Sequence, residues 1–348
     1  MIQKLKLQNI RCFSEQSFEF SPEVNLIIGA NGSGKTTILE AIGFFAFGRF
    51  QSAPQDSLAV SRDQEVGRFE VEILQSDKKI DASAAVLKGS KVTQVNGKKV
   101  PNSKIVGLQK AVYFNPETID LVSGSPQIRR RELDIIIAQN KKSYLLGLLN
   151  FRRIIKQRNE LLRLICLGRS KEGELDYWDG QLVRAGGNIY KERTKLLKKI
   201  NERLGDVHKY LIGAESTLVL KYQPSVEYSR FDEALAGARD IDLRVGATTL
   251  GPHRDDFSFC ENEFNLKDGA SRGEQRVAAA AFKALSKDYL TDDEPPILII
   301  DDIFSELDDK RRESILHILE GNTQVFVSAT DEQVVPKSLL KKAKIIKL

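Results

Sequence analysis

The first third of the chain is built from short stretches in which apolar and polar residues alternate, a pattern that predicts β-strands with one buried face. Asn96-Gly97, directly after one such stretch, is a strong signal for a two-residue hairpin turn. A long helical pattern after residue 37 is the exception in this region. The expected strands are Ile2–Gln8, Val24–Ile28, Arg68–Leu74, Ile80–Leu87, Lys91–Val95 and Ala111–Phe114.

The middle of the chain changes to helical periodicity, with apolar residues recurring every three or four positions. A polar break at Gly168–Gly173 separates two long helical stretches, Ile128–Ile165 and Leu175–Leu204, which predicts a helical hairpin or small bundle. Strand patterns then return, and Ile297–Ile300 is apolar throughout, as in a buried parallel strand. The remaining expectations are strands at Thr217–Tyr222, Val245–Thr249 and Gln324–Ser328 and helices at Glu274–Tyr289 and Lys310–Leu319.

Charge adds to this picture because it is unevenly distributed. The 348 residues carry a net charge of +5, yet residues 126–210 hold 20 Lys and Arg against 10 Asp and Glu, while the remainder holds 33 against 38. This asymmetry indicates that a polyanion meets the middle segment. Every apolar run is shorter than the ~18 residues that a membrane span needs. The three scattered cysteines fit a reduced compartment, so we expect a cytoplasmic protein without a membrane partner.

The most specific chemical signal is the phosphate loop, Gly29–Thr37, which reads GANGSGKTT between a strand pattern and a helix pattern. Glycines let backbone N–H groups close around phosphates, and the helix N-terminus adds a favourable dipole. Lys35 is expected to reach the β- and γ-phosphates, and the Thr36 hydroxyl to bind Mg²⁺. The alternative is a glycine-rich turn without a ligand. The expected nucleotide contacts are Asn31, Gly32, Ser33, Gly34, Lys35, Thr36 and Thr37.

Three further segments carry polar side chains at suggestive places. Ile297–Asp302 reads ILIIDD, and an apolar strand that ends in two carboxylates is typical of a Walker B element, although ordinary strand ends also carry such residues. Ser305–Asp308 follows it as SELD. Upstream, the signature segment Ser271–Gln275 reads SRGEQ at the start of a helix pattern. A capping box between Ser271 and Glu274 explains that segment almost as well.

In order and spacing, these segments resemble the ATP-binding-cassette superfamily. The resemblance implies Lys35, Asp301 and Asp302 as catalytic residues, with Asp302 polarising the attacking water and Asp301 joining Thr36 as a Mg²⁺ ligand. It also implies that Ser271, Gly273 and Glu274 close on the ATP of a second copy, so that the chain forms an ATP-dependent homodimer. Two departures are Ala270, where Leu is usual, and Ser328–Asp331, which lacks the usual switch histidine; a slow ATPase is consistent with the second.

Ser271 lies 235 positions after Thr36, and the basic helical segment between them is too short for the long coiled coil of the structural-maintenance-of-chromosomes (SMC) proteins. The chain instead resembles the RecF family of bacterial recombination mediators. The segments that carry this resemblance are Asn9–Arg11 with Phe13, Phe114–Glu117, Gly124–Pro126, Arg129–Asp134, Thr249–Asp256, Asp301-Asp302, Ser305–Asp308 and Gln324–Val327.

The RecF resemblance implies an α/β fold: an ATPase head from residues 1–119 and 218–348, with an inserted helical, basic second lobe at 120–217. It implies ATP-dependent binding of duplex or gapped DNA and recombinase loading with RecR and RecO. An SMC-like DNA clamp and a transporter-type ATPase subunit are the alternatives; the short insertion disfavours the first and the basic insertion the second.

Basic residues in the middle segment are candidates for DNA phosphates, although a charge run is more often a solvated helix face. The selected DNA-binding set is Arg129, Arg130, Arg131, Arg152, Arg153, Lys156, Lys195 and Lys198, within clusters that also contain Arg158, Arg163, Lys191, Arg193 and Lys199. Arg11 is a candidate contact for ATP because a guanidinium suits phosphate. His253 and Arg254 are either a structural pair or part of a ligand site.

Overall fold

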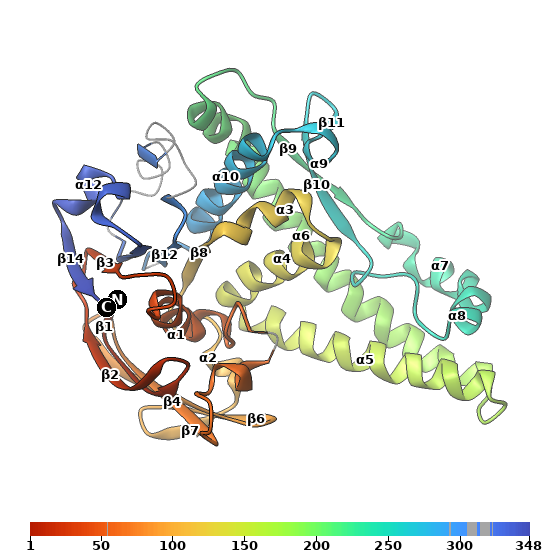
Figure 1. Ribbon diagram of the computed structural model, residues 1–348. Coiled ribbons are helices and arrows are strands. Elements are labelled where there is room, and N and C mark those ends of the chain that lie inside the picture. Colours follow the sequence, from red (N-terminus) through yellow and green to blue (C-terminus); the bar gives the residue numbers. More distant parts are fainter. Residues whose placement is uncertain (54, 292–293, 305–311, 314–320, 322) are drawn as a thin grey trace. The chain divides into compact units, whose positions relative to one another are not determined.

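The computed structural model describes residues 1–348 except 54, 292–293, 305–311, 314–320 and 322 (Figure 1). The chain forms two compact units. The first unit comprises residues 1–118, 206–215 and 279–348, and the second comprises residues 119–205 and 216–278. Residues 218–278, expected in the head, pack with the helical segment in the second unit.

A six-stranded antiparallel sheet in the order β2-β1-β4-β5-β6-β7 forms one layer of the first unit. Its strands are β1 (Ile2–Ile10), β2 (Phe13–Glu19), β4 (Val66–Gln75), β5 (Lys78–Leu87), β6 (Ser90–Val95) and β7 (Lys98–Val100). The hairpin predicted at Asn96-Gly97 joins β6 to β7, and both residues have positive φ, 49° and 72°. Strand β2 was missed because it buries only Phe18, so its sequence shows little alternation.

A five-stranded parallel sheet in the order β14-β3-β13-β12-β8 forms the other layer. Its strands are β3 (Val24–Ile28), β8 (Ala111–Phe114), β12 (Ile297–Asp301), β13 (Val325–Ala329) and β14 (Ala343–Lys347). The predictions of β3, β8, β12 and β13 are confirmed. All four are short and largely apolar, as strands covered on both faces require.

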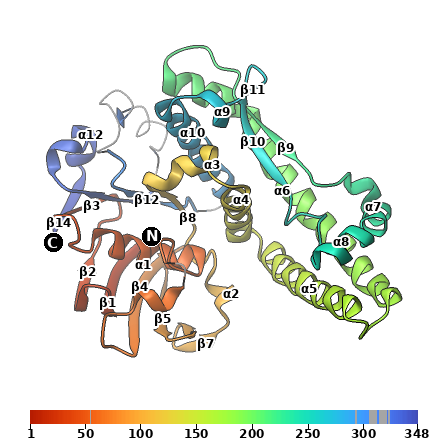
Figure 2. The ribbon, with the colours of Figure 1, turned by 45° about the vertical axis from the view of Figure 1, so that its right-hand side comes forward.

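Helix α1 (Lys35–Phe47) packs against strands of both sheets, and Figure 2 shows it between the layers. It is buried on nearly every side, which its almost uniformly apolar sequence favours. Phe44 and Phe45 join Phe69 of β4 in edge-to-face ring contacts, within the core that also contains Ile299 of β12. The phosphate loop is therefore held between a buried strand and a buried helix. The shorter elements of this unit are η1 (Asp56–Ala59), α2 (Asn102–Ile105), η6 (Glu332–Val334) and α12 (Lys337–Leu340).

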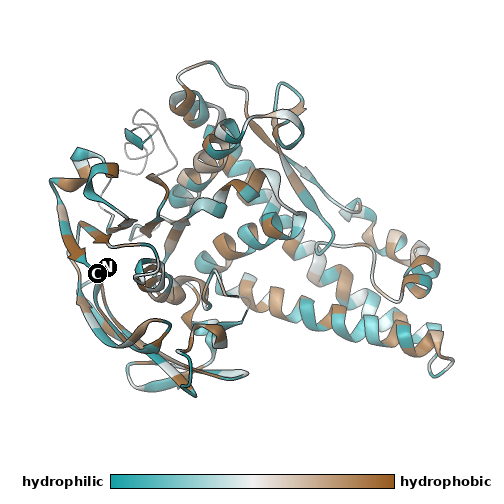
Figure 3. Ribbon diagram, viewed as in Figure 1, coloured by the Kyte–Doolittle hydropathy of each residue, from teal (hydrophilic) through white to brown (hydrophobic). Residues whose placement is uncertain are grey.

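The second unit is mostly helical with a small sheet in the order β11-β10-β9. Its principal helices are α4 (Pro126–Asn140), α5 (Lys142–Cys166) and α6 (Leu175–Ile212), whose end from residue 206 belongs to the first unit. Helix α10 (Arg272–Leu290) begins in the second unit and belongs to the first unit from residue 279 onward. The strands are β9 (Val219–Gln223), β10 (Asp256–Glu261) and β11 (Phe264–Asn265). Hydrophilic positions recur along α5, as Figure 3 shows. The shorter helices are α3 (Asp120–Ser123), η3 (Glu172–Glu174), η4 (Tyr228–Arg230), α7 (Phe231–Gly237), α8 (Arg239–Val245) and α9 (Leu266–Gly269), with η2 (Pro116–Ile119) leading into the unit.

Two expectations for this region are wrong, and one lies outside the described residues. The stretch from Ile128 to Ile165 is two helices, because Lys141 has an extended φ of −128° between α4 and α5. The strand expected at Val245–Thr249 is instead the end of α8 and a loop, since Gly246 caps the helix with a φ of 67°. The helix expected at Lys310–Leu319 falls almost wholly on undescribed residues. Among the helices that the structure describes, none is both long and apolar enough to cross a membrane.

Candidate nucleotide-binding site

The phosphate loop has the backbone geometry that glycine permits. Gly32 and Gly34 have φ values of 83° and 104°, in the left-handed region. A Cβ on Gly34 would lie 2.6 Å from the ring of Phe13, so this position requires glycine for space as well as for conformation. The first turn of α1 follows directly, with its free N–H groups at the loop.

Lys35 lies buried within the loop, and its ammonium donates to the carbonyl oxygens of Gly29 (2.7 Å) and Ala30 (3.0 Å). These contacts satisfy the charge locally, and phosphate oxygens can replace them. Ser33 Oγ is buried and has no hydrogen-bond partner within the part of the chain that the structure describes. A buried orphan hydroxyl is unfavourable, so an added acceptor in the loop would stabilise it.

The carboxylate of Asp301, at the end of β12, is fixed by three hydroxyl groups. Thr36 Oγ1 and Ser328 Oγ donate to Asp301 Oδ1 at 3.2 and 2.6 Å, and the Tyr113 hydroxyl donates to Oδ2 at 2.9 Å. Burial, together with the nearby Asp301 charge, raises the pKa of Tyr113 well above its usual value, which keeps this hydroxyl protonated as a donor. Tyr113 and Ser328 were not among the expected site residues. Tyr113 lies in β8 and Ser328 in β13, the two strands that flank β12. Only the order of the strands in the sheet could have indicated that these two residues contact Asp301.

Asp302 follows with a φ of 51°, in the left-handed region that a non-glycine residue rarely adopts. Its backbone N–H donates to Ser328 Oγ at 3.0 Å. The same serine therefore joins both residues of the Asp301-Asp302 pair. An uncommon backbone conformation held by its surroundings is frequent at functional sites.

Arg11 comes from the turn between β1 and β2 and lies beside the start of α1. Its guanidinium donates to Glu40 (2.5 Å) and Ser52 (2.9 Å), with a longer contact of 3.5 Å to Thr37 Oγ1. The expected site residues of this part of the chain all belong to the first unit: Arg11, Lys35, Thr36, Asp301 and Asp302.

The signature segment belongs to the second unit. Ser271 N–H donates to the Glu274 carboxylate at 2.7 Å and Glu274 N–H donates to Ser271 Oγ at 3.3 Å, so the capping box is present at the start of α10. Ser271 and Glu274 are exposed and Gly273 is half-buried. Ser305–Asp308, expected to follow the Walker B strand, lies outside the described residues.

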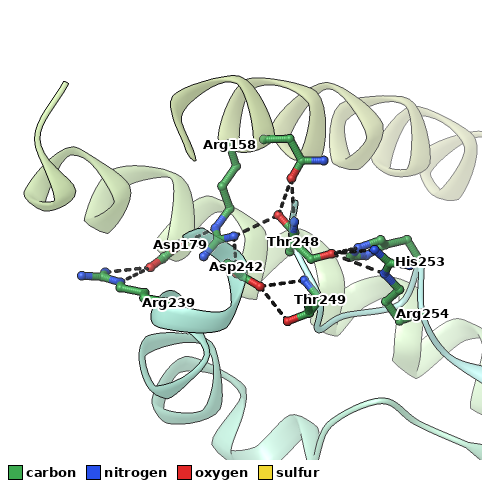
Figure 4. Close-up of polar contacts among 9 residues, drawn as sticks. Arg158, Asp179, Arg239, Asp242, Thr248, Thr249, His253 and Arg254 are labelled. Atoms are coloured by element: carbon green, nitrogen blue, oxygen red, sulfur yellow. Dashed lines mark hydrogen bonds and ion pairs between the residues drawn. The ribbon is translucent and has the colours of Figure 1, made fainter. Parts of the chain in front are cut away.

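Three arginines from the basic clusters are buried in ion pairs, which argues against the DNA contacts expected of them. Arg129 donates to both carboxylate oxygens of Asp256, and Arg193 pairs with Asp134. Arg158 is fully buried between Asp179 and Asp242, as Figure 4 shows. Arg130 and Arg131 are half-buried, and Arg130 donates to the Asp255 carbonyl oxygen. The exposed members are Arg152, Arg153, Lys156, Arg163, Lys191, Lys195, Lys198 and Lys199.

His253 and Arg254 form a structural pair (Figure 4). His253 Nε2 donates to the Thr248 carbonyl oxygen at 3.0 Å, and the Arg254 guanidinium donates to the same oxygen. Burial lowers the pKa of His253 to about 4, outweighing the hydrogen bond to Thr248 that favours the charged form. His253 is therefore neutral at physiological pH.

The donor set suits a magnesium nucleotide. Thr36 Oγ1 and Asp301 Oδ1 are hard oxygen atoms that lie 3.2 Å apart, and Mg²⁺ prefers oxygen atoms of this kind. A phosphate loop between a parallel strand and a buried helix, with a carboxylate at the end of a nearby strand of the same sheet, defines the class. This is a P-loop nucleotide-binding head, and the order of phosphate loop, signature segment and Walker B strand along the chain is that of the ATP-binding-cassette type.

Comparison with known proteins narrows that class. Residues 1–347 match the family description "RecF/RecN/SMC N terminal domain". The DNA replication and repair protein RecF of Moorella thermoacetica is 33% identical over 352 residues, covering 100% of this chain and 94% of the relative. The RecF protein of Bacillus cytotoxicus is 31% identical, and the match covers 99% of this chain and 96% of the relative. The chain therefore belongs to the RecF family of DNA replication and repair proteins.

Solved structures agree with this assignment. A structure of the recombination mediator protein RecF with ATP, from the RecFOR pathway, superposes with a TM-score of 0.90 at 30% identity, over 96% of this chain and 93% of the other. An SMC head bound to the C-terminal domain of ScpA, derived from Pyrococcus furiosus, gives a TM-score of 0.57 at 16% identity, over 99% and 92%. The latter likeness concerns the fold alone. The expected fold class, an α/β ATPase head with a helical lobe, is confirmed.

Proposed function

We propose that this chain is a cytoplasmic, ATP-dependent DNA-binding protein of recombinational repair. Two copies associate through bound ATP, hold duplex or gapped DNA by its phosphates, and help RecR and RecO to load recombinase. The observation that carries this proposal is the grouping of Lys35, Thr36 and Asp301 around one loop, in a chain of the RecF family.

In this proposal, the phosphate loop binds the triphosphate of ATP. Lys35 exchanges the carbonyl oxygens of Gly29 and Ala30 for oxygens of the β- and γ-phosphates. Thr36 and Asp301 hold Mg²⁺, which when bound neutralises charge on the phosphates. The Asp302 carboxylate polarises the attacking water. Hydrolysis is slow and times the release of the partner copy and of DNA.

The signature segment acts on a second copy. Ser271 and Glu274 are exposed at the N-terminus of α10, a helix of 19 residues, where backbone N–H groups and the helix dipole favour an anion. In the proposal, Ser271, Gly273 and Glu274 close on the ATP bound by the partner copy, with the Ser271 hydroxyl and the backbone N–H groups facing the phosphates. Each ATP is then shared between two chains, which makes association depend on the nucleotide.

DNA contacts are assigned to exposed basic residues of α5 and α6. Arg152, Arg153 and Lys156 are exposed on α5, and Lys195 and Lys198 on α6, whereas Arg129 is removed from the expected set because it is buried against Asp256. Such contacts reach phosphates rather than base edges, so binding is independent of sequence and sensitive to salt.

The test is a measurement of DNA affinity with and without MgATP at two salt concentrations. We expect MgATP to strengthen binding, and the Lys35→Ala variant to lose both MgATP binding and this stimulation. The paired substitution Lys195→Glu and Lys198→Glu should keep MgATP affinity but weaken DNA binding and reduce the salt slope by about 2.

A matched control for charge is Lys98→Glu with Lys99→Glu, two exposed lysines in β7 of the first unit. This control should leave DNA affinity and the salt slope unchanged. DNA binding that ignores both MgATP and salt would overturn the proposed function.

A further inference from the structure

Glu40 is a fully buried carboxylate in α1, close to the phosphate loop, that the proposed mechanism does not use. Both of its oxygens accept hydrogen bonds. Oε1 accepts from the Ser52 backbone N–H at 2.5 Å, and Oε2 accepts from the Ser52 hydroxyl at 2.9 Å and from Arg11 Nη2 at 2.5 Å. A buried carboxylate is costly unless it is paired, and here Arg11 supplies the opposite charge.

The guanidinium of Arg11 is held from several sides. Besides Glu40, Nη2 donates to Ser52 Oγ at 2.9 Å, and the guanidinium carbon lies 5.8 Å from the centre of the Phe50 ring. The contact of Nη1 is long, 3.5 Å, and it reaches Thr37 Oγ1 in the phosphate loop. Glu40 and Ser52 therefore fix one nitrogen of the fork, and the other is directed to the loop. The side chain of Arg11 remains 26% exposed, so an anion can still reach it.

The backbone around Arg11 is also fixed against the loop. Arg11 has a φ of 47°, its N–H donates to the Ala59 carbonyl oxygen, and its carbonyl oxygen accepts from Ser61 Oγ at 2.8 Å. The next two residues contact the phosphate loop directly: Cys12 Sγ lies 3.8 Å from the Ser33 carbonyl oxygen, and the Phe13 ring occupies the space beside Gly34. An uncommon conformation held from both sides indicates a turn that must keep one geometry.

We propose that Glu40, assisted by Ser52, is a positioning residue for nucleotide binding: it orients the Arg11 guanidinium so that Nη1 meets a phosphate oxygen of the bound nucleotide. Glu40 does not touch the nucleotide. It acts through Arg11, because a guanidinium tied by one nitrogen loses less freedom when it binds a phosphate with the other. This inference rests on the proposed nucleotide site and adds the residue that makes Arg11 effective there.

The test is a double-mutant cycle in MgATP affinity, measured by titration calorimetry on the full chain. Glu40→Gln keeps the size of the side chain and removes its charge, and it should weaken MgATP binding about tenfold, as should Arg11→Ala. Because Glu40 acts through Arg11, adding Glu40→Gln to Arg11→Ala should change affinity less than twofold. Glu19→Gln, an exposed glutamate paired with Lys4, is the matched control and should leave affinity unchanged.

A purely structural role gives different results: Glu40→Gln would then lower the melting temperature while MgATP affinity stays that of the wild type, or the two substitutions would add. Either result overturns the inference. If Glu40→Gln does not fold, Ser52→Ala is the second variant, because it removes one of the hydrogen-bond partners of Arg11. In the wild-type background, Ser52→Ala should weaken MgATP binding about threefold. In a chain that already carries Arg11→Ala, it should leave MgATP affinity unchanged.

A nucleotide-free measurement separates this inference from the proposed function. The Nε–Hε signal of Arg11, assigned by its absence in Arg11→Lys, should report a restrained guanidinium in the wild type and a mobile one in Glu40→Gln. An Arg11 signal that is the same in Glu40→Gln as in the wild type overturns the positioning role, whatever the MgATP affinities are. A wild-type chain that binds no MgATP overturns the proposed function, while a released Arg11 signal in Glu40→Gln still supports the restraint.

Discussion

At the scale of single residues, the site depends on how side chains hold one another before a ligand arrives. Asp301 accepts from Thr36, Tyr113 and Ser328, and Arg11 is held by Glu40 and Ser52. Such pre-positioning reduces the freedom that binding or reaction must remove. The residues that do the holding are as informative about function as those that meet the nucleotide.

The substitution Tyr113→Phe tests whether the orientation of the Asp301 carboxylate matters for ATP hydrolysis. Losing the hydroxyl removes one donor to Asp301 Oδ2, so the carboxylate is oriented less well, and we expect ATP hydrolysis to slow about tenfold, or about 1.4 kcal/mol in the barrier. MgATP affinity should change little, because Thr36 and Lys35 are untouched, and the free energy of unfolding should fall by about 1 kcal/mol. Single-turnover phosphate release and calorimetry check these values. Tyr177→Phe, at a tyrosine that is 64% exposed, is the control and should change neither hydrolysis nor stability. A hydrolysis rate of Tyr113→Phe equal to that of the wild type would contradict the role of Tyr113.

At the scale of elements, the segment Thr248–Asp256 shows how a motif can be structural. Arg158 of α5 donates to Thr248 Oγ1 and Asp242, while Asp255 accepts from the hydroxyls of Tyr222 and Tyr228 (Figure 4 shows the Arg158 side). The segment thus joins α5, α8 and β9 through buried polar groups. The network is not fully satisfied among the described residues, because Arg158 Nη2 and His253 Nδ1 are buried without a hydrogen-bond partner, and this offsets part of its stabilising effect.

The pH dependence of stability reports on this segment. His253 is neutral in the folded protein, with a pKa of about 4, whereas an unfolded histidine has a pKa of about 6.5. Below pH 6.5 the unfolded state takes up the proton first, so stability is fully present above pH 6.5 and is lost as pH falls to 4, by at most about 3 kcal/mol. Urea unfolding at pH 7.5 and 4.5 measures this loss. His253→Gln should lose less stability over the same interval; an identical loss would show that other groups dominate.

The sequence predicted local elements well and their assembly poorly. The phosphate loop and the strands at Val24–Ile28 and Ile297–Asp301 are encoded by contiguous residues, whereas Tyr113 and Ser328 reach Asp301 only through the order of the parallel strands. The helical spacing of the basic residues would have shown which members of the clusters are buried. Arg158 falls on the same helical face as the buried Ile154 and Leu161, and Arg193 on that of Ile189 and Leu196, so both point to the interior.

At the scale of the whole molecule, residues that the sequence analysis placed in one head lie in two units. The phosphate loop belongs to the first unit and Ser271 to the second, because β10 pairs with β9 and α9 packs on β10. The signature segment is proposed to act on the ATP of a second copy, and the test of that proposal is the state of association.

Ser271→Arg is the corresponding prediction. The larger cationic side chain obstructs the partner copy at the signature segment while leaving Lys35 and Thr36 of its own chain unaltered. We expect MgATP affinity to change less than twofold and the MgATP-dependent dimer to disappear in light scattering. Ser229→Arg, at another exposed serine of the second unit, should still give dimers. Dimers of Ser271→Arg in MgATP would contradict the shared-nucleotide arrangement.

The placement of the cysteines has a practical consequence. Cys12 is exposed beside the phosphate loop in the first unit, Cys166 is exposed at the end of α5 in the second, and Cys260 is buried in β10. Thiol-reactive dyes or spin labels should therefore attach at two native positions, one in each unit, without an engineered cysteine. A fluorophore on Cys12 would report nucleotide arrival at the phosphate loop, and one on Cys166 would report changes at the end of α5. The natural chain is thus already suited to single-molecule spectroscopy.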